Sequence, residues 1–98
     1  KPPWRGRKEA YIAHIREASA SARLVSAADK LHNARSILSD YRQVGEDLWD
    51  RFTGKKEGTL WYYGALLDAF RETGTKPAIV DELDRTITEL NRLAGGSR

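Results

Sequence analysis

Hydrophobic residues recur three and four positions apart along most of the chain, which is the spacing of one face of an α-helix. This spacing predicts helices over residues 7–19, 20–41, 46–52 and 59–73, and a further helix whose first turn contains Pro77. No segment alternates apolar and polar residues as a half-buried strand does. The pattern therefore predicts an all-α fold, a helical bundle of four to five helices that forms a single helical unit over residues 1–98.

Each longer expected helix has one apolar face. The faces consist of Tyr11, Ile12, Ile15 and Ala18 in the first helix; Leu24, Ala27, Ala28, Leu31, Ala34 and Leu38 in the second; Leu60, Tyr63, Leu67 and Phe70 in the fourth; and Val80, Leu83, Ile87, Leu90 and Ala94 in the fifth. Trp4 and Trp49 are expected to anchor the core or an interface, because an indole ring carries a large apolar surface.

Proline, glycine and hydroxyl residues mark the expected boundaries of these helices. The prolines in KPPWRG are expected to keep residues 1–6 extended, and TGKKEG, residues 53–58, reads as a loop. Ser19 or Ser21 is a candidate N-cap of the second helix, and Thr75 is a candidate N-cap of the fifth. Glycine is expected to end helices at Gly45, Gly74, Gly95 and Gly96.

Composition restricts the function classes. The 17 basic and 14 acidic side chains leave a net charge of +3 that is spread along the chain. This charge favours a phosphate-bearing ligand slightly and argues against a nucleic-acid partner. The lack of cysteine excludes disulfides, thiolate metal sites and cysteine nucleophiles. No apolar run approaches the roughly 18 residues of a membrane span, and no signal-peptide pattern is present, so we expect a cytoplasmic protein with no membrane partner.

A stripe of short polar side chains runs along the second expected helix, roughly opposite its leucines. At about 100° per residue, this side of the helix contains Ala22, Ser26, Asp29, Asn33 and Ser36. A typical solvated face carries Lys, Glu and Arg, whose long stems cover the helix. Short polar groups suit a surface that a metal, a ligand or another helix approaches closely. The alternative, an ordinary face in water, stays open on the pattern alone.

The segment AADKLHNAR, residues 27–35, resembles the last metal-ligand motif of the HD-domain metal-dependent phosphohydrolases, most closely the RelA/SpoT-like (p)ppGpp hydrolase branch. The segments WRGRKEAYIAHI and GTLWYYGALLDAF are also similar to the segments that flank this motif in bacterial HD proteins. The resemblance covers about residues 2–70. It implies an HD-domain-like fold and the hydrolysis of a nucleotide-type phosphate ester such as (p)ppGpp, a guanosine polyphosphate.

The resemblance also implies roles for individual residues. Asp29 matches the metal-binding aspartate of the motif, and Asn33 matches an asparagine that faces the nucleotide. The metal would be divalent, most often Mn²⁺ in this branch, and would activate a water and polarise the phosphate under attack. Three basic residues, Lys8, Arg23 and Lys30, are candidates to neutralise the phosphates of the nucleotide substrate.

The chain departs from this family because it lacks the His-Asp pair. Its only histidines, His14 and His32, are not followed by aspartate. His32 is expected to be a hydrogen-bonded structural group, and His14 is expected near the edge of an apolar face rather than beside Asp29. In the family, the other metal ligands and an acidic catalytic pair precede the matched segments. The resemblance therefore implies the C-terminal half of a larger HD domain, inactive alone, whose uncovered surface favours a homodimer.

Two other interpretations concern binding rather than hydrolysis. A non-catalytic, small helical protein-interaction module would use the apolar face of the fifth helix to meet a partner. The run Trp61, Tyr62 and Tyr63 resembles a base-stacking platform, but consecutive residues of a helix point in different directions. Core packing of Tyr63 and partial burial of Trp61 are expected instead. The polar stripe favours the phosphohydrolase, because an interaction module has no need for Asp29 and Asn33 together.

Overall fold

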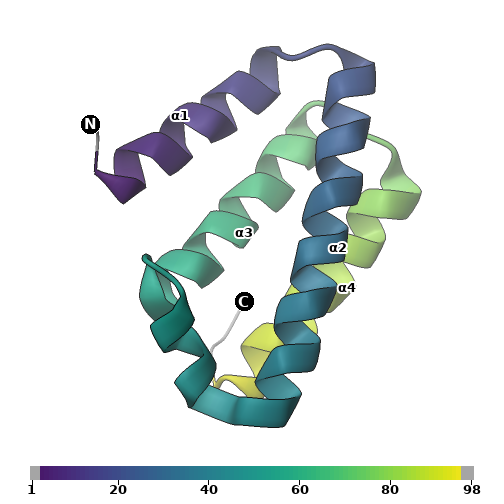
Figure 1. Ribbon diagram of the computed structural model, residues 1–98. Coiled ribbons are helices and arrows are strands. Elements are labelled where there is room, and N and C mark those ends of the chain that lie inside the picture. Colours follow the sequence, from purple (N-terminus) through teal and green to yellow (C-terminus); the bar gives the residue numbers. More distant parts are fainter. Residues whose placement is uncertain (1–2, 96–98) are drawn as a thin grey trace.

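The computed structural model describes residues 3–95, and the regular elements in this range are all helices (Figure 1). In chain order they are α1 (Trp4–Glu17), α2 (Ala20–Val44), the 3₁₀ helix η1 (Gly45–Arg51), α3 (Lys55–Glu72) and α4 (Pro77–Leu93). The all-α helical bundle expected from the sequence is thereby confirmed, while an HD-domain-like fold stays a prediction. Within these residues no helix combines the length and the apolar character needed to cross a membrane. Pro2 and Gly96 lie outside the described range.

The helices pack as a thin bundle in which α4 contacts both α2 and α3, whereas α1 lies mainly against α3 (Figure 1). The described residues extend over 37 × 35 × 20 Å, so the bundle is about two helix diameters thick. The short η1 turns the chain from the end of α2 to the start of α3. Close backbone approaches between α2 and α3 are few, which leaves space for side chains between these two helices.

The apolar face of α4 lies in the core, as its sequence pattern predicts. Its members Val80, Leu83, Ile87, Leu90 and Ala94 are each at most 7% exposed. This face is covered by the protein's own helices and is not available to a partner helix. The interpretation as an interaction module relied on this face being exposed, so the buried face no longer supports it.

Two ion pairs show how α2 lies beside α4. Arg35 pairs with Glu82 at 3.2 Å and Arg42 pairs with Glu89 at 3.5 Å, and each pair joins residues 47 positions apart. The two helices therefore run parallel and in register. The same offset places the first residue of α4, Pro77, level with residue 30 of α2, so the first turns of α2 extend beyond α4.

The apolar face expected for α2 is buried at Ala27 but wrong at its neighbours in the first half of the helix. Leu24 and Ala28 are exposed, and Val25 is 70% exposed. The buried positions of this helix are Ala27, Ala34 and Ile37. The register with α4 gives the reason, because the first turns of α2 have no α4 beside them to cover these apolar side chains.

Several predicted helix ends are confirmed. The Ser19 side chain caps α2 by accepting a hydrogen bond of 3.2 Å from the backbone N–H of Ala22. Gly45 follows α2 with φ +65° and Gly74 follows α3 with φ +67°, a left-handed conformation in which glycine has no steric penalty. The prediction for Thr75 is wrong, because Lys76 holds the N-cap position of α4 and the Thr75 hydroxyl instead lies 3.1 Å from that of Thr73.

Two expected loops are wrong because they contribute residues to helices. α1 begins at Trp4, inside the segment expected to be extended, and α3 begins at Lys55, inside TGKKEG. Both differences involve one contact, in which the Trp4 indole lies against Gly54 and Gly58. A Cβ atom on Gly58 would lie 3.0 Å from this ring, and a Cβ atom on Gly54 would overlap it. These glycines therefore admit an aromatic ring rather than interrupt a helix.

Candidate functional site

A cavity of about 320 Å³ lies between α1, α2 and the first half of α3. Its lining brings together Lys8 from α1, Lys30 and Asn33 from α2, Arg51 from η1 and Tyr62 from α3. Three of these residues, Lys8, Lys30 and Asn33, are substrate-binding candidates of the sequence analysis. Among residues 3–95, its lining includes three cationic side chains and no carboxylate. Such a lining attracts anions.

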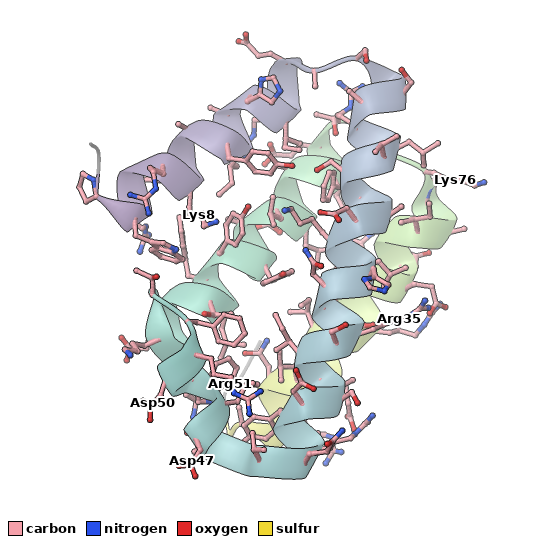
Figure 2. All side chains as sticks on the ribbon, in the orientation of Figure 1. Lys8, Arg35, Asp47, Asp50, Arg51 and Lys76 are labelled. Carbon is pink, nitrogen blue, oxygen red and sulfur yellow. The ribbon has the colours of Figure 1, made fainter. Side chains whose placement is uncertain are left out.

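Tyr62 lies between the two lysines of the cavity. The Lys8 Nζ is 4.7 Å from the centroid of the Tyr62 ring, and the Lys30 Nζ is 5.9 Å from it. Figure 2 shows Lys8 leaving α1 on the side that faces α3. Lys30 also approaches the Tyr11 ring to 4.9 Å, and the Tyr11 hydroxyl lies 2.7 Å from that of Ser26. Aromatic rings thus hold both ammonium groups at one end of the cavity.

The charges of this end are unfavourable in the free protein. Partial burial lowers the pKa of Lys8, and the neighbouring charges of Lys30 and Arg7 lower this pKa further. Two like charges in a partly dehydrated place oppose each other, and a bound anion would relieve the repulsion. Lys30 is only 15% exposed in its side chain, so its charge acts inside the cavity more than in bulk water.

Two tyrosines, Tyr62 and Tyr63, also line the cavity. Burial raises the pKa of Tyr62, and the neighbouring Tyr11, Tyr63 and Asp29 raise this pKa further. Burial, followed by the charge of Asp29, raises the pKa of Tyr63 to about 12. Both phenols therefore keep their protons at neutral pH and can donate hydrogen bonds to an anionic ligand.

Asp29 lies at the edge of the cavity rather than inside its lining. Its carboxylate Oδ2 is 3.6 Å from the Lys30 Nζ, and its side chain is 60% exposed. Its charge nevertheless contributes to the raised pKa values of Tyr62 and Tyr63, for which burial is the larger cause. Asp29 and Lys30 precede Asn33 by four and three positions, so each of them is a neighbour of Asn33 on the surface of α2.

The residues present do not form a metal site on their own. Among residues 3–95, no group of three or more His, Cys, Asp or Glu side chains is placed so as to hold a metal ion. A hard divalent cation such as Mn²⁺ takes about six ligands, and Asp29 could supply one oxygen. We therefore assign no chemical step to a metal in this chain.

The other candidate residues lie apart from the cavity lining. Arg23 donates a hydrogen bond from Nη1 to the backbone carbonyl of Ala18 at the junction of α1 and α2, and its Nε is buried without a partner. His14 is exposed, with its ring centroid 6.4 Å from that of Tyr11. His32 is exposed as well, and its expected structural hydrogen bond is not formed with any residue that the structure describes. The structure thus groups Lys8, Lys30 and Asn33 and separates Arg23 from them.

Arg51 and Tyr62 line the cavity although the sequence pattern does not predict either of them as a site residue. Arg51 follows Asn33 by 18 positions and lies on a 3₁₀ helix, so no helical spacing connects the two residues in the sequence. The sequence pattern predicts a buried Tyr63 and a partly buried Trp61, and the structure confirms both. It makes no prediction for Tyr62, which lies between them in the sequence. The three consecutive aromatic residues 61–63 are the feature of the sequence that could have pointed to Tyr62 as a binding residue.

A second hollow, of about 520 Å³, lies on the outer surface of α3 and α4. Its charged lining residues neutralise one another, since Arg71 pairs with Asp84 at 2.7 Å and with Asp81 at 3.3 Å. Residues of both signs line this hollow, so it has no clear preference for a charged ligand. The cavity between α1, α2 and α3 is therefore the stronger candidate site.

Comparisons with known proteins do not assign a family to the chain. No protein-family model matches the sequence, and no curated protein matches it either. The resemblance to HD-domain phosphohydrolases accordingly stays a prediction from the residues of AADKLHNAR and its flanking segments.

Proposed function

We propose that this chain forms the substrate-binding wall of an HD-type metal-dependent phosphohydrolase that acts on a nucleotide-type phosphate ester such as (p)ppGpp. One observation carries the proposal. Lys8, Lys30 and Asn33, which come from two helices and are up to 25 positions apart in the sequence, line one cavity that contains no carboxylate. The reaction class, phosphate ester hydrolysis, is inferred from the resemblance of the segment around Asp29 and Asn33 to the HD-domain motif. The phosphates are proposed to bind in the cavity.

Each residue has a definite task in this proposal. Lys8 and Lys30 neutralise the phosphate oxygens, and the repulsion that lowers the pKa of Lys8 is relieved when an anion is bound. Asn33 donates from its amide to the nucleotide, since it makes no side-chain hydrogen bond with another described residue. Asp29, next to Lys30 at the rim, contributes one metal ligand. Asp29 alone does not complete a metal site, because a hard divalent cation takes about six ligands.

The test separates binding from hydrolysis. The chain should bind inorganic pyrophosphate and GDP in calorimetry at low ionic strength, because exposed charges are strongly screened in high salt. In a protein that joins this segment to an upstream His-Asp pair, Asp29→Asn should reduce Mn²⁺-dependent pyrophosphate release from ppGpp by about 100-fold or more. The same variant should change pyrophosphate affinity by less than about threefold, since Asp29 is not in the cavity lining.

A matched control keeps this test specific. Asp47→Asn removes an exposed carboxylate of η1 that lies away from the cavity (Figure 2), and it should leave both readouts unchanged. Full hydrolytic activity in Asp29→Asn would show that Asp29 is not a metal ligand. Failure of the unmodified chain to bind either anion would remove the cavity from the proposal.

A second candidate function, the helical interaction module, is favoured by one surface. Val25 is 70% exposed and Leu24 lies beside it, on the part of α2 that extends beyond α4. Such exposed apolar side chains are available to a partner or to a second copy of the chain. The surface thus offers a place for the homodimer expected from the sequence.

Sedimentation velocity tests this candidate directly. The chain should self-associate at high concentration, and Val25→Asp should shift it to monomer, because burying an unpaired carboxylate opposes association. Val44→Asp is the control, since Val44 is an exposed apolar residue at the other end of α2, and it should leave association intact. A monomer at every concentration would contradict the candidate, as would an equal effect of the two substitutions.

A further inference from the structure

Arg51 lines the cavity and has a long, exposed ion pair with Asp40. Its Nη1 lies 4.0 Å from the Oδ2 of Asp40, with side chains that are 58% and 49% exposed. This separation is beyond hydrogen-bond distance, and exposed ion pairs of this kind contribute little to stability. Arg51 therefore belongs to the cavity lining, while its ion-pair partner Asp40 lies outside that lining.

The two lysines and Arg51 occupy different ends of the cavity. Figure 2 shows Lys8 in the upper part of the molecule on α1, and Arg51 in the lower part, where its side chain extends toward α2. Lys30 lies with Lys8 near the ring of Tyr62, so the cavity has a two-lysine end and an arginine end. A single phosphate at the lysines would leave Arg51 unused, whereas an extended polyphosphate would reach toward it.

We propose that Arg51 is an exchangeable binding group that leaves Asp40 for the distal phosphate of an extended polyphosphate ligand. This inference rests on the proposed function of the cavity and adds a specificity residue to it. Exchange is favourable because a guanidinium binds a phosphate through short, paired, charge-assisted hydrogen bonds, which the pair with Asp40 does not have.

A double-mutant cycle with two inorganic probes tests this assignment. Calorimetry on the chain compares tripolyphosphate, which is extended, with orthophosphate, which is not. Arg51→Gln should weaken tripolyphosphate binding about tenfold, and Asp40→Asn should strengthen it about two- to fivefold by freeing Arg51. Orthophosphate affinity should change less than about twofold in both variants, because a single phosphate is bound by the lysines.

The coupling between the two residues gives the decisive readout. The gain from Asp40→Asn should disappear in the Arg51→Gln background, since no arginine is left to release. Asp50→Asn and Arg35→Gln are charge-matched controls whose side chains lie outside the cavity lining (Figure 2), and neither should distinguish the two probes. Circular dichroism of each variant checks that the helices are intact.

The possible outcomes separate the inference from the proposed function. If Asp40→Asn still strengthened tripolyphosphate binding in the Arg51→Gln background, the inference would be overturned, because the effect would then come from net charge. Equal effects on tripolyphosphate and orthophosphate would overturn it as well. If lysine-dependent binding of both probes remained while Arg51 had no effect, the inference would fail and the anion cavity would stand. If neither probe bound, both would fail.

Discussion

Phe70→Ala is expected to lower the free energy of unfolding by about 3–5 kcal/mol. Phe70 is 0% exposed and lies in α3 at the centre of the core cluster. Truncation removes most of its apolar area from the core and leaves a cavity that the surrounding helices fill only in part. A domain of this size has a total stability of roughly 5–15 kcal/mol, so the variant should lose a large part of it.

Urea denaturation followed by tryptophan fluorescence measures this effect. Phe70→Leu, which keeps most of the buried volume, should lose clearly less stability than Phe70→Ala. Val25→Ala is the surface control and should change the free energy of unfolding by no more than about 0.5 kcal/mol, because Val25 is 70% exposed. A loss below about 1 kcal/mol in Phe70→Ala would mean that this part of α3 does not pack as described.

The double variant Lys8→Met/Lys30→Met should lose pyrophosphate affinity by about 100-fold or more, because each lysine contributes a charge-assisted interaction. The same double variant should unfold no more easily than the unmodified chain at pH 7, since it removes two like charges that oppose each other at one end of the cavity. Loss of binding without loss of stability is typical of side chains that are held in place for a ligand. Calorimetry and urea denaturation give the two readouts.

Lys8 adds a pH dependence whose sign follows from its lowered pKa. Its pKa in the folded chain lies below the ordinary value of 10.5, so the unfolded chain binds more protons between these two values. Stability therefore rises with pH across that interval. The stabilising effect of Lys8→Met should accordingly be greatest at neutral pH and should shrink as the pH approaches 10.5.

A control of equal charge shows whether the cavity is responsible for the loss of affinity. Lys76→Met/Arg35→Gln removes two positive charges whose side chains lie outside the cavity lining (Figure 2). It should reduce pyrophosphate affinity less than about threefold at moderate salt. If the two double variants weakened binding equally, the anion would respond to net charge alone, and the assignment of Lys8 and Lys30 would be wrong.

Local features of the fold were predictable because they depend on neighbouring residues. The face of α4, from Val80 to Leu90, has the spacing of a buried helix and is buried. Ser19 caps α2 by accepting a hydrogen bond from the backbone N–H of Ala22. Both residues lie within one helical turn, so this cap could be predicted from the local sequence. Predictions failed where the partner was distant, as for the start of α3, which depends on the contact of Trp4 with Gly54 and Gly58.

The candidate site shows the same division. Lys30 and Asn33 were predictable together, because three positions on one helix place them on one side. Lys8 was chosen only for its charge, and no local rule distinguished it from Arg23, which instead bonds to the carbonyl of Ala18. Arg51 was not predicted, since its place in the lining depends on how η1 turns the chain between α2 and α3.

Helical periodicity and capping chemistry thus specified which segments of this chain become helices and which side of α4 is buried, because these properties act within a few turns. The tertiary structure decided which half of α2 is covered, through its parallel register with α4. It also decided which cations share one cavity. Such outcomes depend on contacts between residues tens of positions apart, and no local pattern encodes the geometry that brings them together.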